Sequence, residues 1–482
     1  MKIQRRGALS LAVLITVALA TADVSFAQNK TTSTRADQQA LSLTVYNSNV
    51  ALVRDVRQVR LPTGNVEFDF ADVASAIEPA TVRIVSLTDP KQLTVLEQDY
   101  RYDLLTPGKL LHYSVGKQIT LVRQVTENNL TKELPMKATL LSDNGGQVWQ
   151  AGNEIITGMF PYEYIFPSLP PGLYSKPTLV WMLNNRDAGE QKLEADYMTK
   201  NVNWSADYVL TLPAEGMTAD LNSWVTLSNS SGASFREAQL QLVAGQVHQA
   251  APTPRPMFRA QAMAVGGAVA PEMQQESLSE YHLYTIERPV TLPDQSSKQI
   301  AFLRASGIKV QKTYEIDGQQ YYFYSPIPGG QPAKEPVQAH LKFKNSEDNS
   351  LGVPLPAGTV RVYQADSRGR LQFVGEDHIT HTAKDENLNL YIGNAFDVAA
   401  ERKQTDFQTL GKDIYESAYQ ITVRNHKKDA ITVEVNEPVT GEWTVLESNY
   451  KYEKTSAFSI RFQVPVAADG QSVLKYRVRA HR

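Results

Sequence analysis

The sequence predicts an all-β protein made of two β-rich, sandwich-like antiparallel regions, joined by a flexible linker rich in Pro, Ala, Gly and Met. Three observations support this fold class. Short segments alternate apolar and polar residues, turn residues separate these segments at regular spacing, and amphipathic stretches of helical length are scarce. Alternation with period two is typical of strands that bury one face, and many short, evenly spaced strands indicate a sandwich.

Alternation begins at Leu41 and recurs along the first half of the chain. In residues 66–70 (VEFDF) apolar and acidic residues alternate without exception, as a half-buried antiparallel strand requires. The best candidate for a helix is the segment 104–113, and Pro107-Gly108 limits it to one or two turns. The alternation predicts further strands at 41–46, 50–61, 81–87, 118–125, 224–227 and 239–243.

A segment without periodicity, residues 249–275, separates the two β-rich regions. Its Pro, Gly and small residues indicate a flexible or extended tether. Its methionines allow an alternative interpretation, in which part of the segment docks a partner. We therefore expect four parts in the chain. They are a signal peptide at 1–27, an N-terminal β-rich domain at 28–245, a linker at 246–279 and a C-terminal β-sandwich-like domain at 280–482.

The C-terminal region shows the alternation most plainly. Residues 419–425 and 430–435 alternate on either side of the polar turn 426–429. This spacing predicts a β-hairpin whose isoleucines and valines share one face. Further strands are expected at 443–446, 459–464 and 472–478.

Composition and charge exclude several classes of protein. The chain has 482 residues, of which 42% are hydrophobic and 21% charged, which is ordinary for globular domains and argues against a largely disordered chain. Lys and Arg (48) nearly balance Asp and Glu (51), so no overall basic field attracts nucleic acid. The absence of cysteine excludes disulfides, thiolate metal sites and cysteine nucleophiles.

The N-terminus is typical of a secretory signal peptide. Lys2, Arg5 and Arg6 precede the uncharged run 8–20, and residues 25–27 (SFA) provide a small-residue cleavage site. This run is shorter than the roughly 20 apolar residues of a spanning helix, so an uncleaved anchor is the less favoured alternative. No later run is long enough to cross a bilayer as a helix. Because exported proteins without cysteine are typical of bacteria, we expect the periplasm or outer envelope of a Gram-negative bacterium.

Several long strings resemble one bacterial family. They are residues 354–363 (PLPAGTVRVY), 375–382 (GEDHITHT) and 393–398 (GNAFDV), and the segments 96–103 and 242–245 are similar to its exported members. The chain thus resembles proteins with the domain of unknown function 4139, which are related to mucoidy-inhibitor-A-like proteins, although it lacks their coiled coil. The resemblance implies a β-rich envelope protein and supplies no catalytic residues.

Asp377, His378 and His381 form the best cluster of metal-capable side chains. Histidines three residues apart share a face in a helix, but they point to opposite faces of a strand. The flanking residues 371–374 favour a strand, so a solvated strand end is the preferred interpretation. No cofactor is predicted, and a divalent metal at these residues remains open. No nucleophile elbow, phosphate loop or dinucleotide fingerprint occurs.

Aromatic residues concentrate at 160–167 and 321–324. On strands, Tyr162 and Tyr164 would share one face and Tyr322 and Tyr324 another, where exposed rings stack on sugars or bind a peptide. The alternative is that these rings belong to the core and cover the sheets.

We therefore expect a non-catalytic binding or scaffold module for envelope proteins or glycans, without nucleic acid as a partner and with self-association left open. Sheet edges provide natural docking sites for such partners. The alternative is a metal-assisted or carboxylate-dependent hydrolase that acts on envelope material. No catalytic residue is assigned.

Overall fold

The computed structural model confirms that the protein is all-β. In the part of the chain that it describes, the strands form six sheets, and the one α-helix is α1 (Pro107–His112), which matches the short helix that Pro107-Gly108 predicted. No helix in this part is long and apolar enough to span a membrane. The predicted signal peptide, 1–27, lies outside the described residues. The described residues are 29–127, 130–158, 161–170, 173–245, 273–278, 281–327 and 331–482.

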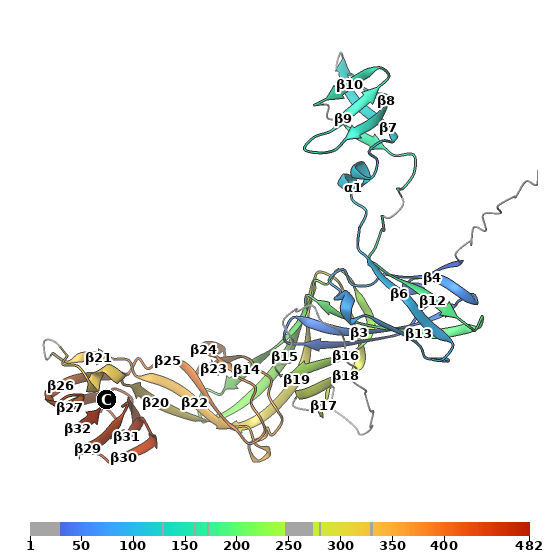
Figure 1. The fold of residues 1–482 in the computed structure, drawn as a ribbon. Helices are drawn as coiled ribbons and strands as arrows, with labels where there is room; N and C mark the ends of the chain where they lie inside the picture. Colours follow the sequence, from blue (N-terminus) through green and yellow to red (C-terminus); the bar gives the residue numbers. More distant parts are fainter. Residues whose placement is uncertain are drawn as a thin grey trace, which may run out of the picture.

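The molecule is elongated, with the N-terminal sheets at one end (right in Figure 1) and the C-terminal sandwich at the other. Two sheets make up the N-terminal end. The first has the strand order β1 (Asn29–Ser33), β4 (Gly64–Ala71), β12 (Thr178–Asn185) and β6 (Leu93–Arg101). The second has the order β17 (Met273–Leu278), β18 (Tyr281–Leu292), β16 (Phe235–Ala244), β2 (Gln38–Tyr46), β3 (Val50–Arg60), β13 (Glu190–Lys200) and β5 (Arg83–Ser86).

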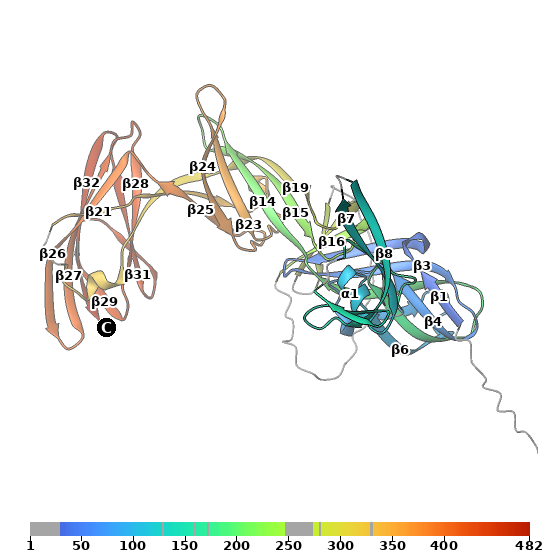
Figure 2. The same cartoon turned by 90° about the horizontal axis from the view of Figure 1, so that it is seen from above.

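A third sheet extends from these two toward the C-terminal sandwich (Figure 2). Its interior is continuous with theirs, because buried residues such as Phe68, Leu43 and Val360 belong to one hydrophobic cluster. Its strand order is β19 (Ser296–Lys309), β15 (Thr218–Asn229), β14 (Val202–Leu212), β23 (Gly358–Ala365) and β24 (Leu371–Ile379). Short 3₁₀ helices accompany the sheets at η1 (Arg35–Asp37), η2 (Pro79–Thr81) and η4 (Glu347–Asn349).

Strands from both sides of the expected linker share these sheets. β16 pairs with β18, β15 pairs with β19, and β14 runs parallel to β23. The division at 246–279 therefore does not separate two groups of sheets, because alternation locates strands without identifying their neighbours. Within the expected linker, residues 273–278 form β17 against β18, and residues 246–272 and 279 lie outside the described part.

Two further sheets form the C-terminal sandwich around their own buried cluster, which includes Ile421, Val433 and Phe462. One has the order β25 (Asn387–Asn394), β22 (Gln338–Lys344), β20 (Gln311–Asp317), β28 (Ile431–Pro438), β31 (Ser459–Val466) and β30 (Tyr452–Ser456). The other has the order β21 (Ala333–Glu335), β26 (Val398–Gly411), β27 (Ile414–Asn425), β32 (Gly470–His481) and β29 (Glu442–Ser448).

The hairpin predicted across residues 419–435 is wrong. β27 pairs with β26 and β32, whereas β28 pairs with β20 and β31 in the facing sheet. Ile421 and Val433 are both fully buried, and they meet in the core from opposite sheets. Burying both apolar faces against each other stabilises this arrangement, so the polar turn connects two sheets instead of two paired strands.

Candidate functional site

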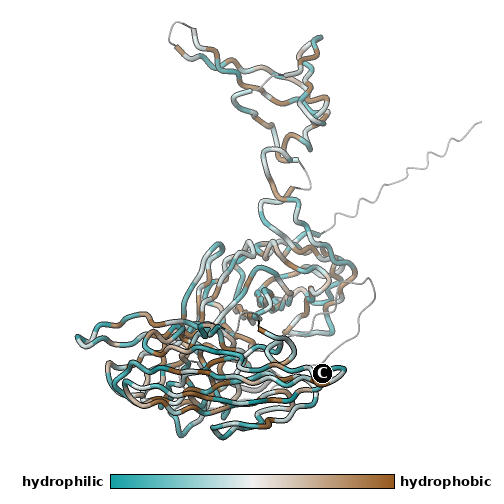
Figure 3. Tube along the Cα trace, turned by 90° about the vertical axis from the view of Figure 1, so that its left-hand side faces the viewer, coloured by the Kyte–Doolittle hydropathy of each residue, from teal (hydrophilic) through white to brown (hydrophobic). Residues whose placement is uncertain are grey.

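A small domain inserted between β6 and β12 projects from the N-terminal end, at the top of Figures 1 and 3. We call residues 104–173 the head. The two chain segments that connect it are paired, because the backbone N–H of Leu105 donates to Tyr174 (2.9 Å) and that of Tyr174 donates to Asp103 (3.0 Å). Hydrogen bonds from Lys109 and Tyr113 to the Asp103 carboxylate add to this junction and hold the pKa of Asp103 below its usual value.

The head has a hydrophobic core of its own. Its sheet has the order β10 (Glu154–Thr157), β9 (Val148–Ala151), β8 (Leu130–Ser142), β7 (Gln118–Glu127) and β11 (Glu163–Ile165). Trp149 is fully buried in a cluster with Leu111 of α1 and Leu121 of β7, and this cluster is separate from the other two. The predicted binding residue Tyr164 packs on this core. Its ring stacks on Trp149 with centroids 6.0 Å apart, and its hydroxyl lies 2.6 Å from Gln147 Oε1.

The outer surface of the head is unusually apolar. Ten of the 26 exposed large apolar side chains in the described part of the chain lie in this domain, although it is a small fraction of the sequence. The predicted residue Tyr162 is 65% exposed. Soluble proteins seldom expose large apolar patches without a functional reason. The ten residues are Leu105, Tyr113, Val115, Leu130, Leu134, Leu141, Ile155, Tyr162, Ile165 and Leu169.

Several of these residues lie on the β7–β8 hairpin or beside it, whereas the most exposed one, Ile155 (72%), lies on β10 at the other edge of the sheet. Leu130, Leu134 and Met136 share one face of β8 with Lys132, and of the three apolar residues Met136 packs against the head core. Leu134 lies opposite Arg123 of β7, and the N–H of Tyr162 donates to Val122 on the other edge of β7 (2.8 Å). Leu130 (67% exposed), Leu134 (44%) and Tyr162 thus lie on the sheet face that carries the core, but beyond the core's edge, where solvent reaches them. We call these three residues the head patch.

The predicted residues Tyr322 and Tyr324 lie in the C-terminal sandwich, far along the chain from the head. Residues 320–323 form a 3₁₀ helix, η3 (Gln320–Phe323), where a strand was expected. Tyr322 is buried, its hydroxyl contacts Glu335 (3.3 Å), and the Arg402 guanidinium lies 4.7 Å from its ring centroid. The Tyr324 hydroxyl donates to the carbonyl of Thr440. Among the four predicted tyrosines, Tyr162 is therefore the one most exposed to solvent.

Tyr322 belongs to a buried charge cluster that the sequence analysis did not identify. The side chains of Arg402 and Glu437 are 1% and 0% exposed, and they form an ion pair at 2.6 Å. Arg402 also pairs with Glu335 (2.9 Å), and the Tyr476 hydroxyl donates to Glu437 (2.8 Å). Burial raises the pKa of Glu437, and the attraction of Arg402 opposes this rise. The cluster lies inside the sandwich core, so it acts on stability.

The three predicted metal ligands have separate protein partners. Asp377 and His378 lie on β24, where Asp377 accepts from the backbone N–H of Tyr391 (2.8 Å) and His378 Nδ1 lies 3.0 Å from Thr359 Oγ1. His381 follows the strand, and its Nδ1 accepts from the backbone N–H of Ala357 (3.2 Å). Within the described ranges, no three His, Asp or Glu side chains are grouped as metal ligands.

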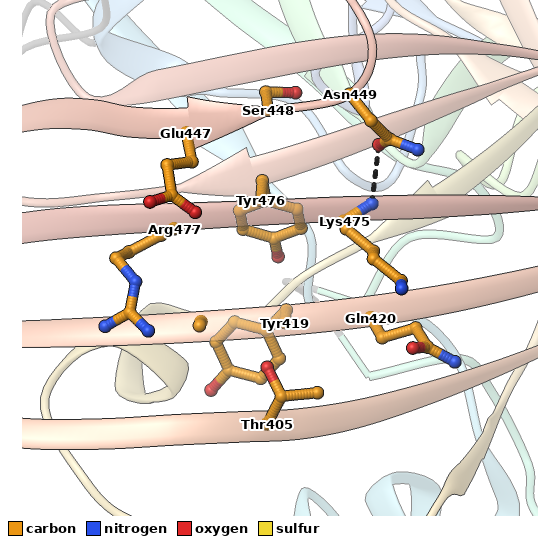
Figure 4. A pocket seen from close by; sticks show the side chains of 10 residues that line it. Thr405, Tyr419, Gln420, Glu447, Ser448, Asn449, Lys475, Tyr476 and Arg477 are labelled. Atoms are coloured by element: carbon orange, nitrogen blue, oxygen red, sulfur yellow. Dashed lines mark hydrogen bonds between the residues drawn. The ribbon is translucent and has the colours of Figure 1, made fainter.

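The outer face of the C-terminal sandwich carries an open hollow of about 500 Å³, with mostly polar side chains (Figure 4). Arg477 at this hollow is already paired with Asp406 (2.7 Å) and Glu416 (3.5 Å). The side chain of Asn449 accepts from the Lys475 backbone N–H (2.7 Å), which ties the β29 end to β32. Of the three charged side chains at the hollow, Arg477 is thus satisfied within the protein.

A family model for the domain of unknown function DUF4139 matches residues 193–478, which is more than half of the chain. The chain belongs to the DUF4139 family. The match runs from β13 to β32 and so covers the third sheet and the sandwich, whereas the head lies outside it. No curated protein sequence matches the chain. The family description names no activity, and the expected relation to mucoidy-inhibitor-A-like proteins stays a prediction.

Proposed function

We propose that this DUF4139 protein is an exported, non-catalytic binding module of the bacterial envelope, and that its head patch docks a partner protein. The observation that carries the proposal is the concentration of exposed apolar side chains on a projecting domain with its own core. The basic N-terminus, the apolar run and the SFA site support export.

The chemistry of the head patch suits a protein partner. Interface centres are apolar and enriched in tyrosine, with a polar rim around them. Tyr162, Leu130 and Leu134 would supply the apolar contacts, and the exposed Arg123, on β7 between Leu134 and Tyr162, would supply a charge among them. The separate core and the paired connecting segments present this surface away from the other sheets. A partner can therefore reach the head patch without contacting the sandwich.

Site-specific photo-crosslinking in the cell tests the proposal. A photoreactive amino acid replaces Tyr162 in the full exported chain, and a matched variant carries it at Tyr321, an exposed tyrosine of the sandwich (57% exposed). We expect a discrete protein adduct from position 162, absent from position 321 and lost when Leu134→Glu is added.

Three results would contradict the proposal. The first is no adduct from position 162, and the second is an identical adduct from both positions. The third is an adduct that survives Leu134→Glu in a chain whose head is still folded by hydrogen exchange. Export is checked separately by fractionation, since deletion of residues 1–27 is expected to retain the protein in the cytoplasm.

A further inference from the structure

A second cavity lies at the waist of the molecule, where the third sheet meets the C-terminal sandwich. It has a volume of about 260 Å³, somewhat below the roughly 300–1,000 Å³ of sites for drug-sized ligands. Its walls come from both hydrophobic clusters, with Leu212 and Leu341 from the first and Tyr314 and Ala339 from the second. Binding sites occur preferentially at such junctions between domains.

One wall of this cavity belongs to a sheet of the sandwich, and the facing wall, with Leu212, Gln364 and Val374, comes from the third sheet. β20, β22 and β25 belong to the same six-stranded sheet as β28 and β31 of the sandwich. Leu341 and Leu390 of this sheet are buried in the first cluster, whereas Val433 is buried in the second. Hydrogen bonding within this sheet therefore fixes the wall formed by β20, β22 and β25 relative to the rest of the sandwich.

The polar part of the cavity carries an excess of positive charge. Lys312 and Lys427 both line it, and Asp397 is the one carboxylate in the lining. Asp397 lies 4.0 Å from Lys427, at the limit of an ion pair, and the Lys427 ammonium is 5.8 Å from the centroid of the Tyr314 ring. In the described part of the chain, no carboxylate lies within 4.0 Å of the Lys312 ammonium. Desolvation and the neighbouring Lys427 lower the pKa of Lys312.

The apolar part of the cavity is marked by Phe396, whose side chain is 98% exposed. The turn that carries it is fixed on both sides. The N–H of Ala395 donates to the carbonyl of Val337 (2.8 Å), and the N–H of His426 donates to the carbonyl of Asp397 (2.8 Å). The backbone thus holds a large aromatic ring in water beside the cavity, although apolar surface of this size is stabilised by being covered.

We propose that the waist cavity binds a small organic anion, in which a carboxylate or phosphate group is joined to an apolar group. The anion pairs with Lys312 and Lys427, which act as point charges for oxygen anions. The apolar group of the ligand lies against Phe396. This activity is independent of the head patch, because the two sites share no residue.

Binding to the full exported chain is measured by calorimetry with phenyl phosphate and benzoate, and with inorganic phosphate and benzyl alcohol as half-ligands. We expect saturable binding of at least one of the first two probes, tighter by about tenfold or more than either half-ligand. Lys312→Met and Phe396→Ser should each weaken this binding by about tenfold or more. The bound anion should also raise the pKa of Lys312, which NMR of ¹³C-methylated lysines detects.

Two matched variants control for unspecific effects. Lys428→Met removes an exposed lysine close in sequence that pairs with Asp469, and Phe458→Ser removes another exposed phenylalanine. Neither should change the affinity. The proposal is overturned if neither phenyl phosphate nor benzoate binds saturably up to about 10 mM. It is also overturned if the Lys312 and Phe396 variants bind like their controls, or if a half-ligand binds as tightly as the joined probe.

Discussion

Replacing Arg402 with methionine should destabilise the C-terminal sandwich far more than the same replacement of an exposed arginine would. The Arg402 guanidinium is almost fully buried between Glu437 (2.6 Å) and Glu335 (2.9 Å), so Arg402→Met leaves two carboxylates without their cation. Removing one partner of a buried pair costs about 3–5 kcal/mol, because the remaining charge is buried and uncompensated. Amides that exchange only when the sandwich unfolds should then exchange faster by roughly 10²- to 10⁴-fold, because each factor of ten corresponds to about 1.4 kcal/mol.

The pH dependence of this variant has a defined sign. Without Arg402, burial raises the pKa of Glu437 further above its value in the unfolded chain. The folded variant then binds more protons than the unfolded chain at pH values above about 4.3, so its free energy of unfolding falls as pH rises from there toward the raised pKa. The variant should therefore be more stable near pH 5 than near pH 8, and adding Glu437→Gln should remove most of this dependence.

Hydrogen exchange of the full chain, followed by mass spectrometry of peptides from β26–β32, measures this loss of stability. Arg424→Met is the matched control, because Arg424 pairs with Glu401 at the surface of the same sheet, where ion pairs are worth less than about 1 kcal/mol. Equal exchange in Arg402→Met and Arg424→Met would refute the reasoning, as would a variant whose stability rises with pH.

Two further predictions concern other parts of the molecule. Trp149→Ala should cost the head about 3–5 kcal/mol, seen as faster hydrogen exchange in β7–β10 with unchanged exchange in β26–β32, because the head core is separate. Burial would raise the pKa of Glu315, but Lys342 at 2.8 Å lowers it overall. Glu315 should thus contribute to a loss of stability as pH falls below about 4.3, and Lys342→Met should reduce this loss in thermal unfolding scans.

Alternation in the sequence predicts which residues of a strand face the core, and this part of the prediction is accurate. The same reasoning places Glu437 inward, because it follows Val433 and Val435 at intervals of two. Arg402 likewise follows Val398 and Ala400. An inward charge on each of two strands was thus a readable signal of the buried pair, although the sequence analysis did not use it.

Alternation does not identify the neighbour of a strand, and for this reason the grouping of strands into sheets could not be predicted. β27 and β28 are consecutive and strongly alternating, yet they lie in opposite sheets. The waist cavity shows the same limit, since Lys312, Phe396 and Lys427 come from three separate parts of the sequence. Pairings of this kind depend on packing between distant segments, which local periodicity does not encode.

The pairing of strands across residues 246–272 has a consequence for how the chain can be divided. Ala244 ends β16 and Met273 begins β17, and both strands bond to β18 in one sheet. A cut between them would remove one covalent connection and would leave the ladder hydrogen bonds between the described strands in place. The two fragments would be held by the same sheets and by the same buried core. The protein can therefore be treated as a two-fragment complex, whose halves are expected to reassemble when they are expressed as separate polypeptides.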